Sequence, residues 1–181
     1  MTEQISPGTQ DAIATWLGWL LAVSFLLLFW NINLLPRTPL DQREFLRVLH
    51  DSLGLLVVVL AALRLIWFVK GPRPAPPTGL PENSFAFNRA ILATLVTTFA
   101  VAGLVGWFYA WGEYHREIVL FGIKVPALLP DGEAVRTSMG YLHSALSFYY
   151  LMLFVVWIGL GLYQHFRYRT GLLRLLPGSR V

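Results

Sequence analysis

The amino-acid sequence predicts an all-α integral membrane protein, a four-helix up-down-up-down transmembrane bundle that forms a single domain over residues 1–181. Two observations support this class. The composition is 56% hydrophobic and only 13% charged, whereas an average soluble domain is about 25% charged. The chain also contains four long apolar segments, and about 20 such residues suffice to cross the hydrocarbon core of a bilayer. We therefore expect the lipid bilayer to be the main environment of the chain.

The expected spans are residues 12–35, 46–69, 90–112 and 139–164. The first, third and fourth spans contain no Asp, Glu, Lys or Arg. The second contains Arg47, Asp51 and Arg64, which lie toward its ends, where charged side chains can reach the interface. We expect the first span to remain in the protein rather than to be a cleaved signal, because the residues before it include no Lys or Arg and the apolar run is too long.

The charges differ between the two ends of the predicted bundle. The connections after the first and third spans contain similar numbers of bases and acids. The proline-rich connection at residues 70–84, expected to be non-helical, and the C-terminal tail have an excess of bases, and the tail has four arginines and no acid. The positive-inside rule then places both termini in the cytoplasm. A basic tail of this kind is an ordinary topology signal, so we expect no nucleic-acid partner.

His50 and His143 are the only histidines inside the four apolar segments. Each lies about five residues into its span, on the second and fourth spans, so up-and-down threading places both near the outer face. Two imidazoles at one depth on two helices of a bundle are what an axially ligated haem needs. The alternative is a pair of interfacial histidines that only form hydrogen bonds. With no cysteine in the chain, any haem is noncovalent and b-type.

Three small residues could complete such a cofactor site. Gly54 follows His50 by one helical turn on a similar face, so a porphyrin could lie flat there. Ser52 could bond to a carbonyl or a propionate, and Gly103 offers a close approach on the third span. Small residues at membrane helix contacts also occur for packing alone, so packing remains the alternative for both glycines.

The order of these residues resembles the bacterial cytochrome b561 family over nearly the whole chain, from about residue 12 to residue 177. The resemblance rests on the set in register rather than on one motif: Leu35-Pro36-Arg37, His50-x-Ser52-x-Gly54, Leu63-Arg64-Leu65-x-Trp67, the proline-rich connection, Gly103, Leu142-His143 and Leu172-Leu173-Arg174-Leu175-Leu176-Pro177. The resemblance implies a bacterial inner-membrane, multi-pass b-type cytochrome of the four-helix, superoxide oxidase-like type.

The family pattern also implies two haems, with His50 and His143 matching the outer pair of iron ligands. The inner ligands are missing, because Ala14-Thr15 and Trp157 stand near the expected positions. The sequence therefore predicts one haem b per chain, with bulky residues including Trp157 in place of the second.

The resemblance implies electron transfer between an outer-face donor and quinone, with ubiquinone as a candidate cofactor and the donor unknown. A superoxide:quinone-type oxidoreductase is one form of this function. The alternative is a non-catalytic accessory or anchor subunit that has lost the inner haem and works with a partner membrane subunit of a larger electron-transfer complex.

Overall fold

The structure is a computed structural model that describes residues 7–71, 76, 79–112, 118–126 and 132–169, without the side chains of residues 7–11. His115, the arginines of the tail beyond residue 169 and most of the proline-rich connection lie outside these residues. The elements, in chain order, are α1 (Pro7–Leu34), the 3-10 turns η1 (Leu35–Arg37) and η2 (Leu40–Gln42), α2 (Arg43–Lys70), α3 (Glu82–Gly112), β1 (Ile118–Leu120), β2 (Ile123–Val125) and α4 (Glu133–Tyr168).

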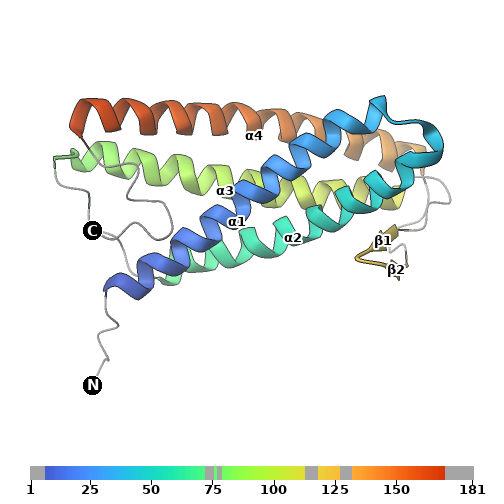
Figure 1. Cartoon of the computed structure of the whole chain (residues 1–181), viewed down its shortest axis with the longest axis horizontal. Helices are drawn as coiled ribbons and strands as arrows, with labels where there is room; N and C mark the ends of the chain where they lie inside the picture. The colour runs from blue at the N-terminus through green and yellow to red at the C-terminus, as the bar shows by residue number, and fades with distance from the viewer. Residues whose placement is uncertain (1–6, 72–75, 77–78, 113–117, 127–131, 170–181) are drawn as a thin grey trace, which may run out of the picture.

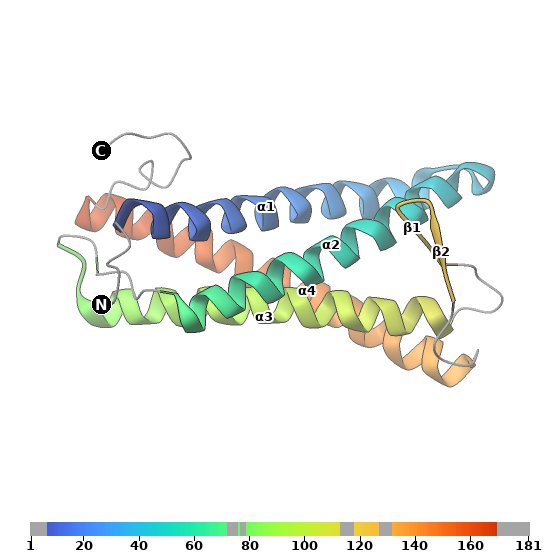
Figure 2. The same ribbon diagram turned by 90° about the horizontal axis from the view of Figure 1, so that it is seen from below.

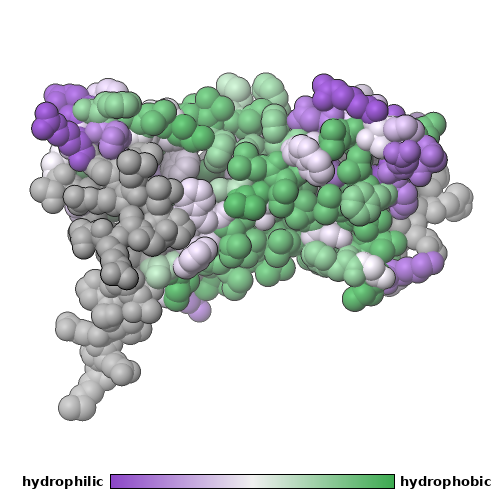
Figure 3. Space-filling view, viewed as in Figure 1, coloured by the Kyte–Doolittle hydropathy of each residue, from purple (hydrophilic) through white to green (hydrophobic). Residues whose placement is uncertain are grey.

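The four helices run alternately up and down along one axis (Figures 1 and 2). All four are long and apolar enough to span a membrane, which confirms the predicted all-α membrane bundle. We call the end where α1 ends at Leu34 and α2 begins at Arg43 the histidine end. The opposite end is where α2 ends at Lys70 and α3 begins at Glu82. Apolar side chains form the middle of the visible surface and polar ones gather toward the two ends (Figure 3).

The helices extend beyond the apolar runs from which they were predicted. Helix α3 begins at Glu82 rather than near residue 90, so residues 82–84 of the expected non-helical connection are helical. Helix α4 begins at Glu133, six residues before the expected span. A helix needs no apolar sequence to continue into the interface, and an acidic residue in the first turn interacts favourably with the helix dipole. Helices α3 and α4 are therefore longer than the apolar spans that they contain.

Consecutive helices pack directly against one another, whereas α1 and α4 meet mainly through long aromatic side chains. The Phe25 ring of α1 lies 4.9 Å from the Tyr150 ring and 4.8 Å from the Phe154 ring of α4, measured between centroids. Phe99 of α3 stacks on Tyr150 at 4.3 Å. These rings join the buried core at mid-depth, so α1 is held to α4 there while the helices remain apart nearer the histidine end.

A short β-hairpin between α3 and α4 is an addition that the sequence did not predict. Ile118 pairs with Val125 and Leu120 with Ile123 in antiparallel register. The two turn residues, Phe121 and Gly122, have φ angles of +50° and +84°, as a two-residue type I′ turn requires. The hairpin lies beside α2 near the histidine end (Figures 1 and 2).

Candidate functional site

His50 and His143 face each other across the interior of the histidine end. Their ring centroids are 6.2 Å apart and the ring planes are nearly perpendicular, at 81°. A histidine nitrogen lies about 2 Å from a metal that it binds, so two imidazoles on opposite sides of one iron have centroids about 6 Å apart. The up-and-down threading thus brings the two histidines to a separation that suits a shared axial site.

Asn31 of α1 fixes the orientation of His50. The Asn31 side chain is fully buried, and its Nδ2 donates a hydrogen bond to the Leu46 carbonyl at 2.9 Å. Its Oδ1 therefore accepts, and Nδ1 of His50 lies 3.2 Å from it. This bond keeps the hydrogen on Nδ1 of His50, so Nε2 is the nitrogen suited to binding a metal.

His143 is oriented in the same way by the backbone of α3. Its Nδ1 donates to the Ala102 carbonyl at 2.8 Å, which again assigns metal binding to Nε2. Gly106, one turn further along α3, provides the space for this ring. A Cβ at Gly106 would lie 2.8 Å from Cε1 and 2.9 Å from Nδ1 of His143, closer than van der Waals contact allows.

The two histidines line a cavity of about 850 Å³, within the range of small-molecule and cofactor sites. All four helices contribute to its wall. Apolar and aromatic side chains predominate, with a few polar groups near the histidine end. The lining residues used below are Phe25, Arg47, His50, Asp51, Gly54, Phe99, Gly103, Gly106, Arg136, His143 and Tyr150.

The structure brings four of the five predicted site residues together and separates the fifth. Gly54 lines the cavity, and a Cβ there would meet nothing within 4 Å. Gly103 also lines it, but its Cβ would lie 2.6 Å from Val58 Cγ2, so Gly103 also serves the close packing of α2 on α3. Ser52 is buried outside this lining, and its hydroxyl accepts a hydrogen bond from the Phe121 amide at 3.0 Å.

Charged side chains lie at one side of the cavity. Arg47 of α2 and Arg136 of α4 both line it, together with Asp51. The Nε of Arg136 is buried and has no hydrogen-bond partner among the described residues. A buried donor without a partner is costly, and two guanidinium groups beside one carboxylate favour an anionic ligand here. The sequence did not reveal this arrangement, because Arg136 lies seven residues before His143 in a segment expected to be a connection.

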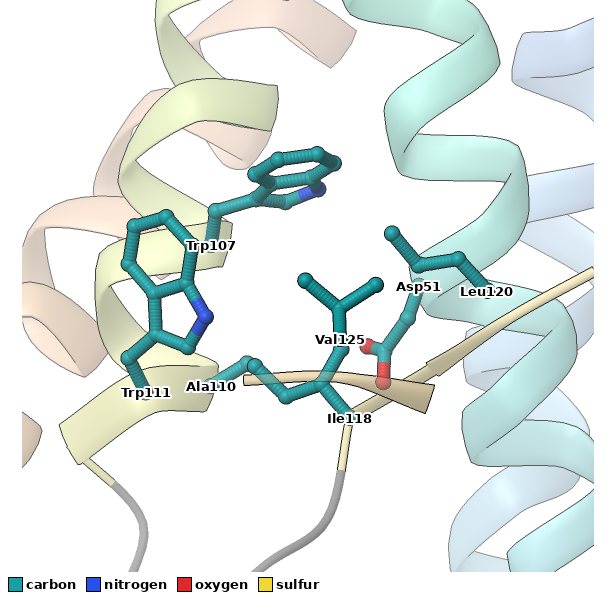
Figure 4. Close-up of a pocket in the computed structure, with 7 residues that line it drawn as sticks. All are labelled: Asp51, Trp107, Ala110, Trp111, Ile118, Leu120 and Val125. Atoms are coloured by element: carbon teal, nitrogen blue, oxygen red, sulfur yellow. The ribbon is translucent and has the colours of Figure 1, made fainter. Parts of the chain in front are cut away.

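A second, much smaller space of about 10 Å³ lies beneath the hairpin. The Trp107 and Trp111 rings project from α3 toward Asp51 and the hairpin residues Ile118 and Val125 (Figure 4). The two rings pack edge to face at 5.8 Å. Asp51 and Trp107 border both spaces, so the hairpin closes the side of the bundle next to the histidine cavity.

In the opposite half of the bundle, apolar side chains of α1 and α4 lie against the buried core. Leu17 of α1 and Trp157 of α4 both pack against the buried core cluster. The Trp157 ring continues the aromatic column from Phe154 at 6.4 Å. His165 lies in the last turn of α4, far along the helix from His143, so it does not join the histidine pair.

The residues around the cavity fit a b-type haem. Two imidazoles at the right separation, an open wall at Gly54, and two partly buried guanidinium groups for two carboxylates are the features such a ligand needs. Within the part of the chain that the structure describes, no group of three or more His, Cys, Asp or Glu side chains could hold a bare metal ion. A haem iron needs only two protein ligands, because the porphyrin supplies the others.

Comparison with known proteins identifies the family of this chain. A family model described as prokaryotic cytochrome b561 matches residues 9–178. Over 133 residues the chain is 30% identical to cytochrome b561 homolog 2 of Escherichia coli (strain K12), an alignment that covers 72% of this chain and 70% of that protein. The resemblance inferred from the sequence is confirmed. The chain belongs to the prokaryotic cytochrome b561 family, whose members are membrane b-type cytochromes that transfer electrons.

Proposed function

We propose that this protein binds one haem b between His50 and His143 and transfers electrons between a donor at the outer face of the bacterial inner membrane and quinone. The observation that carries the proposal is the histidine pair: two rings 6.2 Å apart, each with its Nδ1 bonded to a neighbouring helix. Histidines that served only as interfacial hydrogen-bonding groups would not need to face one another across a cavity.

Different side chains would bind the iron and the propionates of the haem. His50 and His143 would bind the iron through Nε2, while Asn31 and the Ala102 carbonyl keep the two rings in position. Arg47 and Arg136 would pair with the propionates. Haem supplies one-electron redox chemistry when it is bound in this way.

The apolar wall of the cavity controls access of water. Phe25, Phe99 and Tyr150 close the cavity toward the middle of the bundle, and the hairpin packs against the side next to Asp51. An apolar surrounding and the number of nearby charges set the redox potential of a haem. Two arginines and one aspartate at the cavity favour a bound ligand that carries negative charge.

Haem content measures the proposed ligation directly. The purified protein should contain about one haem per chain and should show a low-spin b-type spectrum in the reduced-minus-oxidised difference. His50→Ala and His143→Ala should each abolish or severely reduce bound haem, whereas His165→Ala, at the far end of α4, should leave it unchanged. Normal haem content in either of the first two variants would overturn the ligand assignment.

The stoichiometry also tests the missing second site. Trp157 and Leu17 pack against the core of the opposite half, and we expect Trp157 to pack near Thr15. Among the described residues, His165 is the one histidine at that end, so a second haem with two axial protein ligands would need another kind of ligand beside it. Two haems per chain would therefore refute the single-haem proposal.

The electron partners are tested separately with the haem-loaded protein. Reduced protein should be reoxidised by a ubiquinone analogue, and the rate should fall in variants that lose haem. Haem binding without any reaction with quinone would refute the proposed acceptor while leaving the ligand assignment intact. An intact bundle that contains no haem would instead support the alternative function, an accessory or anchor subunit. The absence of histidine at Thr15 and Trp157, where the family pattern has the inner ligands, is the observation in favour of that alternative.

A further inference from the structure

Two arginines lie close together between α2 and α3 near the opposite end of the bundle. Arg64 is six residues before the end of α2, and Arg89 is seven residues after the start of α3. At a rise of 1.5 Å per residue, both lie about 10 Å inside the helix ends. Arg64 and Arg89 are each partly buried. Arg64 lies inside the apolar run of α2 and Arg89 directly precedes the apolar run of α3, so both lie at the border of the membrane-spanning part rather than in a connection.

Contacts with the neighbouring helix fix the position of Arg89. Its guanidinium carbon lies 4.4 Å from the centre of the Phe68 ring on α2. Phe68 follows Arg64 by four residues and shares its face of the helix. Arg89 is therefore beside the face of α2 that carries Arg64, so the two positive charges lie on facing sides of the α2–α3 contact.

The residue before Arg89 holds α3 in this rotation. Asn88 and Gln164 exchange side-chain hydrogen bonds between α3 and α4, and Gln164 is buried. Successive residues of a helix are about 100° apart. With Asn88 directed at α4, Arg89 is directed away from α4 and toward α2.

Among the described residues, the two positive charges have no acidic side chain close enough to neutralise them. Glu82 is the acidic side chain that the structure describes at this end, and it is exposed. It precedes Arg89 by two helical turns, or about 10 Å along the axis, which is beyond ion-pair distance. Two like charges held together in a partly buried place repel one another, and an anion from outside the chain would relieve that repulsion.

We propose that Arg64 and Arg89 bind the phosphate of an anionic membrane phospholipid. Guanidinium groups bind phosphate oxygens in a bidentate manner, and basic pockets between membrane helices are suited to anionic headgroups. A depth of about 10 Å from the ends of helices that cross the whole bilayer matches the boundary between headgroups and hydrocarbon. The exposed side chains of Leu63 and Val59 on the same helix, on the bilayer-centre side of Arg64, would contact the acyl chains.

Native mass spectrometry of the full-length protein, exchanged into a delipidating detergent with added phosphatidylglycerol, tests this site. The wild type should retain phosphatidylglycerol in preference to phosphatidylcholine, whose own cation competes with the arginines. Arg64→Gln and Arg89→Gln should each reduce retention by about fivefold or more. Arg167→Gln is the control, because Arg167 is an exposed arginine near the same end of the bundle whose guanidinium carbon lies 5.4 Å from the ring centre of its neighbour Tyr168.

The outcomes distinguish a bound lipid from bound free phosphate. Equal phosphatidylglycerol retention by Arg64→Gln, Arg89→Gln and the wild type would refute the site. Displacement of the lipid by millimolar inorganic phosphate would show a free-phosphate site and overturn the lipid assignment. Arg64→Lys guards against misfolding, since it keeps the charge and should retain more lipid than Arg64→Gln. Lipid retention is measured without reference to haem content. The experiment can therefore refute the lipid site without refuting the proposed electron transfer, and the reverse is also true.

Discussion

Asn31 is the side chain through which α1 reaches the histidine pair. It is fully buried, and a buried polar group is stable only if its hydrogen bonds are satisfied. The Leu46 carbonyl and His50 provide both partners. A helix that contributes no histidine to the pair therefore still takes part in positioning one.

Asn31→Leu should weaken haem binding by roughly 10- to 100-fold, the usual effect of losing a residue that orients a metal ligand. The substitution removes the acceptor for Nδ1 of His50 but leaves both histidines in place. Haem titration of the apoprotein measures the affinity, and the redox midpoint provides a second readout. Asn33→Leu is the matched control, because the Asn33 side chain is exposed and donates to the Phe29 carbonyl of its own helix. Equal effects of the two substitutions would contradict the positioning role.

Gly106 leaves room for the His143 ring because glycine has no side chain. A Cβ there would lie 2.8 Å from His143 Cε1, so Gly106→Ala should displace the imidazole and greatly reduce bound haem. Gly159→Ala is the control, because a Cβ at Gly159 would meet nothing within 4 Å. Both changes raise helix propensity by up to about 1 kcal/mol, so a loss of haem confined to Gly106→Ala would be steric. Normal haem content in Gly106→Ala would contradict the packing.

Among the elements, the hairpin of β1 and β2 is attached to the bundle by specific contacts. Ile118 and Leu120 are buried against Trp111 and its neighbours, and the Phe121 amide donates to Ser52 Oγ. Phe121 has a positive φ, a conformation that is strained for a bulky residue. The hydrogen bond to α2 helps to hold the turn in this conformation.

Ser52→Ala should loosen this hairpin without affecting haem. The lost hydrogen bond contributes about 1 kcal/mol, so hydrogen exchange at the Phe121 amide should accelerate about fivefold. Haem content should stay normal, because Ser52 lies outside the lining of the histidine cavity. Ser24→Ala is the control, since the Ser24 hydroxyl bonds to Leu20 of its own helix. A loss of haem in Ser52→Ala would instead place Ser52 in the site, as first expected from the sequence.

At the scale of the whole molecule, the absence of cysteine makes orientation in the membrane directly measurable. Leu40→Cys lies in the connection at the histidine end, and Pro76→Cys lies between α2 and α3 at the opposite end; both positions are exposed. If both termini are cytoplasmic, as the basic tail predicts, an impermeant thiol reagent should label Leu40→Cys in intact spheroplasts. It should label Pro76→Cys only after the membrane is permeabilised. The reverse pattern would place the histidine pair at the inner face.

The sequence by itself determined the bundle and the pairing of the two histidines. Long apolar runs can be stable in a bilayer only as helices that satisfy their own backbone, so four runs predict four spans. The up-and-down order then places residues 50 and 143 at one end. These conclusions depend on the length of each apolar run, its polarity and the order of the runs along the chain. All three can be read from the sequence without knowing how the helices pack.

Only the tertiary structure decided which other residues join the histidines. Asn31, Gly106 and Arg136 are brought to the cavity by the rotation of each helix about its own axis, and that rotation depends on packing between neighbours. Ser52 shows the same dependence, because a rotation of about 200° from His50 directs it to the hairpin instead of the cavity. The apolar character of a membrane segment does not encode this rotation, since lipid and neighbouring helices are similarly apolar.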